Sequence, residues 1–149
     1  MNNNNYRYMT TDAIQESIIE EFSIFDDWLD KYDYLISLSD TLPAMDPALR
    51  NEKNLIEGCQ SRVWVAAELR DGKVYYTADS DAIITKGIIA LLIRVMSGRT
   101  AAEAAALDLY FIDAIGLGEN LSPTRSNGLR AMIQQMKLYA LVFSKQQQQ

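Results

Sequence analysis

Between Arg62 and Ala78 the apolar side chains recur at every second residue, whereas in the flanking segments they recur at helical spacing. Four apolar side chains then fall on one face of an extended strand: Val63, Val65, Ala67 and Leu69. Asp71-Gly72 follows at once, and this dipeptide favours a two-residue hairpin turn because both residues tolerate a positive φ. The sequence therefore predicts an antiparallel hairpin whose second strand runs from Lys73 to Ala78.

Helical spacing precedes this hairpin. Asp12 and Gln15 are typical of a capping box, and the apolar side chains after them recur at helical intervals: Ile14, Ile18, Ile19 and Phe22. Ser23 and Asp26 repeat the cap signature before a second apolar stripe, made of Trp28, Leu29, Tyr32, Leu35 and Ile36. These patterns indicate two helices, or one helix with a break near Ser23. Residues 39–58 lose the periodicity and contain two prolines, which favours a long connecting loop.

Helical spacing returns after the hairpin and predicts four helices: Ala82 to Met96, a short helix capped by Thr100 and Glu103, Leu109 to Ile115, and Pro123 to about Phe143. Ser122 precedes the last helix as its N-cap, and Pro123 occupies the first helical position, where a missing N–H costs little. Helices, then a small antiparallel sheet, then helices indicate the α+β class, with one sheet face packed against helices.

The length of 149 residues fits one domain, which we expect over residues 10–145. Asn2 to Asn5 and Gln146 to Gln149 carry no apolar side chains to offset the entropy of ordering. We therefore expect disordered tails over residues 1–9 and 146–149.

The chain contains no histidine and one cysteine, Cys59. These counts exclude histidine-dependent nucleophilic catalysis, histidine-ligated zinc and an intramolecular disulfide. The net charge of −6 argues against nucleic acid as the partner, because phosphate binding needs a basic surface. No apolar run approaches the roughly 18 residues of a membrane span, so no membrane partner is expected, and the single thiol favours a reducing compartment, the cytoplasm.

Cys59 has two interpretations from its local sequence. A free cysteine is often a buried structural thiol. However, Cys59 lies between Gly58 and the polar pair Gln60-Ser61, immediately before a strand, which is typical of a loop tip. No base adjoins it, so it is a poor hydrolase nucleophile, but a thiol that is not strongly activated is suited to thiol–persulfide exchange.

Two charged features also have alternative interpretations. Asp79-Ser80-Asp81 precedes a helix, which favours N-capping over binding of a cation, since no further ligand cluster accompanies it. Arg125 lies near the positive end of the last helix dipole, an unfavourable place for a cation. Arg125 is therefore either a solvated surface residue or one that has a carboxylate partner or a binding role.

Taken together, four segments resemble the SufE family of sulfur acceptors: Gly58-Cys59-Gln60-Ser61-Arg62-Val63-Trp64, Asp79-Ser80-Asp81-Ala82, Lys86-Gly87, and Leu121-Ser122-Pro123-Thr124-Arg125-Ser126-Asn127-Gly128-Leu129. Each segment alone is a weak signal, but their combination and spacing are specific. The resemblance spans roughly residues 14–142 and implies a SufE/IscU-like α+β fold.

The resemblance also implies a function in iron–sulfur cluster assembly. Members accept sulfur from a PLP-dependent, SufS-like cysteine desulfurase, stimulate it, and pass the sulfur to a SufBCD-type scaffold. By position, Cys59 is the persulfide acceptor, its thiol held in an apolar pocket until a partner draws it out. Gly58, Gln60, Asp81 and Arg125 match positions that engage the desulfurase or position the loop. The chain then needs no cofactor of its own, because PLP belongs to the partner.

Two other functions remain open at this stage. The chain could act by binding alone, as a regulatory module whose cysteine is incidental. It could also be a redox-sensing protein whose thiol is oxidised by peroxide. The sulfur carrier is expected to be a monomer or a weak homodimer, and a carrier and activator rather than a stand-alone enzyme.

Overall fold

The hairpin forms as the sequence predicts. The computed structural model of the chain describes residues 9–57 and 61–147. In it, β1 (Val63–Arg70) pairs with β2 (Lys73–Ser80) in antiparallel register, and the turn residues Asp71 and Gly72 have φ values of 52° and 79°. β2 extends two residues beyond the predicted end at Ala78, because Ser80 pairs with Val63 across the ladder. A two-residue strand, β3 (Arg99–Thr100), adds to the other edge of β2.

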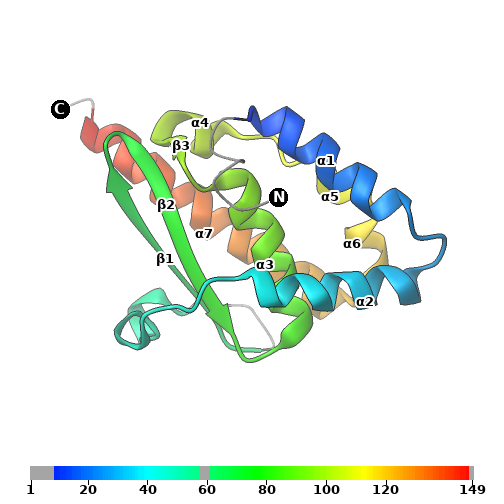
Figure 1. The fold of residues 1–149 in the computed structure, drawn as a ribbon. Coiled ribbons are helices and arrows are strands. Elements are labelled where there is room, and N and C mark those ends of the chain that lie inside the picture. Colours follow the sequence, from blue (N-terminus) through cyan, green and yellow to red (C-terminus); the bar gives the residue numbers. More distant parts are fainter. Residues whose placement is uncertain (1–8, 58–60, 148–149) are drawn as a thin grey trace.

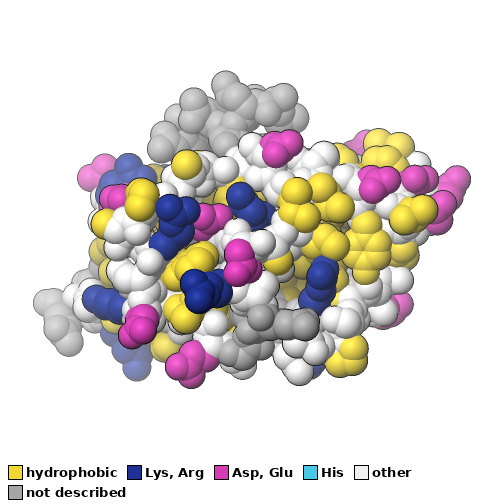
Figure 2. Space-filling view, turned by 90° about the horizontal axis from the view of Figure 1, so that it is seen from below, with side chains coloured by type: hydrophobic (Ala, Val, Ile, Leu, Met, Phe, Trp, Pro, Cys, Tyr) yellow, Lys and Arg dark blue, Asp and Glu magenta, His cyan; other side chains and the backbone are white. Residues whose placement is uncertain are grey.

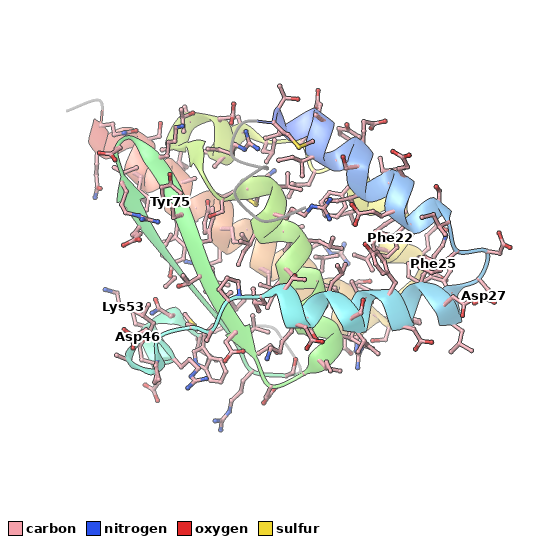
Figure 3. The ribbon with its side chains drawn as sticks, in the orientation of Figure 1. Phe22, Phe25, Asp27, Asp46, Lys53 and Tyr75 are labelled. Carbon is pink, nitrogen blue, oxygen red and sulfur yellow. The ribbon has the colours of Figure 1, made fainter. Side chains whose placement is uncertain are left out.

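The N-terminal residues form two helices, α1 (Thr11–Ser23) and α2 (Trp28–Leu38). Phe22 of α1 and Phe25 of the turn lie where the two helices meet (Figure 3), and the ring centroid of Tyr34 in α2 lies 5.2 Å from the centroid of each. The loop that follows contains three short 3-10 turns: η2 (Ser39–Thr41), η3 (Pro47–Leu49) and η4 (Glu52–Asn54).

Both predicted N-terminal caps are wrong by a few residues. Thr10 caps α1 by accepting a hydrogen bond from Ala13 N–H, and Asp27 caps α2 by accepting one from Asp30 N–H. Gln15 is fully buried instead of serving a capping box. Its amide donates to the Asp108 carbonyl at 3.0 Å and accepts from Phe111 N–H at 3.1 Å. Partners more than 90 residues away satisfy this buried amide, and local sequence does not reveal them.

The apolar helix α3 (Ile83–Met96) crosses the middle of the molecule (Figure 1). It lies between α2 and the sheet, and Gly87 packs directly against Leu35 of α2. A Cβ atom at Gly87 would overlap the carbonyl oxygen of Leu35, which gives a packing reason for glycine inside a helix. Buried side chains of β1 and β2 face the helices: Val63, Val65, Val74, Tyr76 and Ala78.

Four further helices complete the chain: α4 (Ala101–Ala106), α5 (Phe111–Ala114), α6 (Leu117–Asn120) and α7 (Pro123–Gln147). Thr100 caps α4 as predicted. α6 was not predicted; it begins after Gly116, which lies in the left-handed region at φ 74°. α7 continues through Gln147, into the predicted C-terminal tail, because glutamine is a good helix former and extending a helix needs no new nucleation.

The architecture is α+β, a three-stranded antiparallel sheet with helices packed against it, as the sequence predicts. Figure 1 shows the hairpin along one side of the molecule, with α3 and α7 beside it and α1 and α2 beyond α3. Among the described residues, no helix combines the length and apolarity needed to cross a membrane.

Candidate functional site

The base of the cysteine loop is anchored on β1. Gly58, Cys59 and Gln60, three of the predicted site residues, lie outside the described residues. On the near side of the loop, Ile56 N–H donates a hydrogen bond to the Val63 carbonyl at 2.8 Å, and Leu55 forms an isolated bridge with Trp64. The chain thus leaves the sheet edge after Ile56 and returns to it at Val63, so the two ends of the segment are held close together.

Asp81 holds the far side of the same loop. Its carboxylate accepts a hydrogen bond from Arg62 N–H at 3.0 Å, and its own N–H donates to the Arg62 carbonyl at 3.3 Å. The Ser80 hydroxyl also donates to that carbonyl, at 2.8 Å. Three hydrogen bonds therefore fix the backbone of Arg62, three residues after Cys59.

The prediction that Asp79-Ser80-Asp81 caps the next helix is wrong for both aspartates. The N-cap of α3 is Ala82, which forms no side-chain cap, and Ala82 N–H donates to the Ser80 hydroxyl at 3.1 Å. The alternative of a cation site gains no support, because the described part of the chain holds no group of three or more potential metal ligands. Asp81 instead acts on the cysteine loop.

A pocket with a volume of about 200 Å³ opens beside this anchored backbone. It lies between the start of β1, the first turns of α3 and the start of α7. Apolar groups come from Val63, Ala82, Ile88, Gly128 and Met132, and polar groups come from Ser61, Thr85, Thr124 and Arg125. The combination of an apolar lining with a few polar groups is suited to a small, weakly polar group such as a thiol.

Arg125 contributes to this pocket from the first turn of α7. The predicted cap is present, since Arg125 N–H donates to the Ser122 hydroxyl at 3.3 Å. The side chain is exposed, and no carboxylate of the described residues forms an ion pair with it. Because it lies at the positive end of the helix dipole, this cation gains little electrostatic stabilisation from its own protein. It is therefore available to bind an external anion.

Of the two described candidate residues, Arg125 lines the pocket, whereas Asp81 does not line it but holds the adjoining backbone. Arg125 and Ser61 line the same pocket, and Asp81 is bonded to Arg62, the residue after Ser61. Of the nine residues that line the pocket, only Arg125 was predicted as a site residue; Thr85, Thr124, Gly128 and Met132 are among those that were not. Gly128 carried a signal, since glycine inside a helix indicates close packing. Thr124 lies within a segment that carries the family resemblance, whereas Thr85 and Met132 have no local signal, because a pocket wall is defined by contacts across the fold.

Asp79 belongs to a neighbouring charged cluster, with Arg50 and Lys86, that was not predicted. Its carboxylate accepts from Arg50 Nη1 at 2.9 Å and from Ser80 N–H at 2.8 Å, and Lys86 Nζ lies 3.7 Å away. Burial acts to raise the pKa of Asp79, but the hydrogen bonds and the two cations outweigh burial, so this pKa lies below its usual value. Asp79 is therefore ionised at neutral pH.

Comparison with known proteins gives consistent results. A family model described as SufE, Fe-S metabolism associated domain, matches residues 16–140. An uncharacterized SufE-like protein of Rhizobium etli is 39% identical over 135 residues, covering 87% of this chain and 91% of the relative. A second SufE-like protein, from Synechocystis, is 37% identical over 126 residues, with coverage of 85% and 79%.

A solved structure shares the fold. The solution structure of a hypothetical protein from Thermus thermophilus superposes with a TM-score of 0.73 at 21% sequence identity. The match covers 89% of this chain and 96% of the Thermus chain. At this identity the likeness concerns the α+β fold alone.

Proposed function

The chain belongs to the SufE family of iron–sulfur metabolism, and from this premise we propose that it is a sulfur-transfer protein with Cys59 as its acceptor. In this proposal a PLP-dependent, SufS-like cysteine desulfurase supplies the sulfur in the cytoplasm. The chain stimulates that enzyme by removing its persulfide and passes the sulfur to a SufB-type scaffold. It contributes no cofactor of its own, because PLP is bound by the desulfurase.

The chemistry needs one thiol and no change in overall oxidation state. The Cys59 thiolate attacks the outer sulfur of the desulfurase persulfide, and a new S–S bond forms at Cys59. The old S–S bond breaks, and the desulfurase cysteine leaves as a thiolate. The product is a persulfide on Cys59. Absence of histidine from the sequence does not hinder this step, since no strong general base is required at a pH near the thiol pKa.

The observation that carries the proposal is the anchored Arg62 backbone beside the pocket. Ser61 lines the pocket and follows Cys59 by two residues, so covalent geometry keeps their Cα atoms within about 8 Å. A cysteine side chain on this loop can thus reach the pocket. The apolar lining supports a resting state in which the thiol is shielded from solvent, and from which docking of the desulfurase withdraws it.

We assign supporting roles to four residues. Gly58 and Gln60 flank the acceptor in the sequence, and we assign both to contact with the desulfurase. Asp81 is a positioning residue, since it holds Arg62 at the base of the loop. Arg125 contacts the desulfurase, which is supported by its exposed guanidinium at the pocket.

The experiment is intact-protein mass spectrometry under non-reducing conditions. The chain is incubated with a SufS-type desulfurase and free cysteine, next to a Cys59→Ser control. We expect the wild-type chain to gain one sulfur atom that a reductant removes, and the control to gain none. If the wild-type chain gains no sulfur from a desulfurase that is active alone, the acceptor role is wrong.

The same variant separates this function from its alternatives. If Cys59→Ser stimulates the desulfurase fully, the chain acts by binding alone. If peroxide oxidises Cys59 to a sulfenic acid or an intermolecular disulfide while the desulfurase transfers nothing to it, the chain is a redox sensor.

A further inference from the structure

A second pocket lies between the segment 42–50 and the junction of β2 with α3. Its volume is about 390 Å³, and it is lined by Leu42, Pro43, Ala44, Met45, Pro47, Arg50, Asp79 and Lys86. Side chains from three separate parts of the chain therefore meet here. Figure 2 shows the face on which these segments lie, with Lys and Arg side chains grouped around a few acidic ones.

The charges of this pocket do not balance. Among the lining residues, Arg50 and Lys86 both approach Asp79, so two positive charges face one negative charge. The exposed Asp46 of the same loop does not line the pocket, and its carboxylate accepts a hydrogen bond from Ala48 N–H. The side chain of Asp79 is 17% exposed, whereas those of Arg50 and Lys86 are 39% and 37% exposed. Asp79 thus contacts both cations from the more buried side, while N–H donors of the Arg50 guanidinium and the Lys86 ammonium remain accessible to solvent.

The walls of the pocket are pre-formed. Pro43 and Pro47 restrict the backbone, and Asp46 caps the η3 turn by accepting a hydrogen bond from Ala48 N–H at 3.0 Å. The side chain of Asn54 donates to the Leu49 carbonyl at 2.9 Å and ties the two halves of the loop together. Binding to a surface that is already ordered loses less conformational entropy. Figure 3 shows Asp46 and Lys53 on this loop, beside the hairpin.

The two pockets are neighbours across the start of α3. Thr85 lines the pocket beside the cysteine loop, and the next residue, Lys86, lines the charged pocket. Asp79 is two residues from Asp81, which holds Arg62. The two pockets therefore lie on neighbouring faces of the first turn of α3, and a partner that covers this turn contacts both.

We propose that this pocket binds a carboxylate, carried next to an apolar side chain on the desulfurase that docks over the cysteine loop. The excess positive charge selects an anion, and the planar guanidinium of Arg50 is suited to a carboxylate. The surrounding Leu42, Pro43 and Pro47 side chains provide the apolar contact. A free carboxylate would bind weakly to such exposed cations, whereas one held within a larger interface adds specificity to docking. The identification of the desulfurase as the partner depends on the proposed function.

The test measures docking separately from sulfur transfer. The wild-type chain and its variants are titrated into a SufS-type desulfurase by calorimetry, in the absence of free cysteine, so that no persulfide forms. We expect Arg50→Gln and Lys86→Gln each to weaken the Kd roughly three- to tenfold, and the double variant to weaken it further. The remaining binding should depend less on salt concentration.

Lys53→Gln is the matched control, because Lys53 is an exposed cation on the same loop that does not line the pocket. It should leave the Kd within about twofold of wild type. The alkylation rate of Cys59 should be equal in all variants, which shows that the cysteine loop is unchanged. If the double variant binds as tightly as wild type, or Lys53→Gln weakens binding equally, the pocket assignment is wrong.

Mass spectrometry of the same proteins separates this failure from failure of the proposed function. If the wild-type chain gains sulfur while the double variant binds the desulfurase as tightly as wild type, the pocket assignment is wrong and the sulfur-transfer function is supported. If the pocket variants weaken binding to the desulfurase but the wild-type chain gains no sulfur, the pocket assignment is supported and the acceptor role of Cys59 is wrong. If the wild-type chain does not bind the desulfurase, the named partner is wrong and the pocket assignment falls with it.

Discussion

The Asp81 carboxylate accepts a hydrogen bond from the backbone N–H of Arg62 at 3.0 Å, although the two residues are 19 positions apart. This bond ties the end of β2 to the return of the cysteine loop. This bond explains why an aspartate lies just before α3 although its side chain does not cap that helix. The role of Asp81 is therefore to position backbone, and this role can be tested apart from its charge.

Asp81→Asn should retain most of the sulfur-transfer rate, because the asparagine carbonyl can accept the same hydrogen bond. Asp81→Ala should lower the rate several-fold and lower the free energy of unfolding by about 1 kcal/mol, since Arg62 N–H loses its acceptor. The measurements are desulfurase stimulation and urea unfolding. If the asparagine variant is as defective as the alanine variant, the carboxylate charge matters and the positioning role is wrong.

Arg125→Ala should weaken desulfurase stimulation on the order of tenfold while changing the free energy of unfolding by less than about 0.5 kcal/mol. The reason is that this exposed cation forms no ion pair within the described part of the chain. Arg130→Ala is the control, because Arg130 is exposed on the same helix and bonds to Asn127 instead. Equal effects of both variants would argue against a specific contact at Arg125.

Gly87→Ala should destabilise the fold by about 3 kcal/mol or more, because the new Cβ overlaps the Leu35 carbonyl oxygen and forces α2 away from α3. Gly118→Ala provides the comparison. A Cβ atom at Gly118, in α6, would meet no other atom within 4 Å, so alanine there should be neutral or slightly stabilising. Thermal and urea unfolding of the two variants measure the difference.

Glu21→Gln should lower stability at neutral pH by about 1–3 kcal/mol. Burial acts to raise the pKa of Glu21, but hydrogen bonds from Arg94 and Tyr34 outweigh it, so the folded-state pKa lies below 4.5. The contribution is thus complete above the unfolded-state pKa and is lost as the pH falls through the folded-state pKa. Urea unfolding of both proteins between pH 7 and pH 3 should show the difference shrinking toward acid. A difference that stays constant over this range would exclude the charged interaction.

Several local features could be predicted because their causes are contiguous in the sequence. Asp71 and Gly72 provide the positive φ values of the turn, and Ser122 caps the helix that begins one residue later. The four segments that carry the family resemblance also lie within short stretches of sequence, and the match over residues 16–140 confirms that assignment. The boundaries of α1 and α2 were less accurate, since several acidic and hydroxyl residues near each start could serve as the cap.

The sequence by itself determined the hairpin, the order of the longer helices around it, the family and the single thiol, because each depends on neighbouring residues or on composition. The tertiary structure alone decided that Gln15 is satisfied by residues near position 110, and that Asp81 holds Arg62 instead of capping α3. It also decided that Arg50 and Lys86 share Asp79. These contacts join residues 7 to 96 positions apart, and only the folding of the whole chain brings their atoms together.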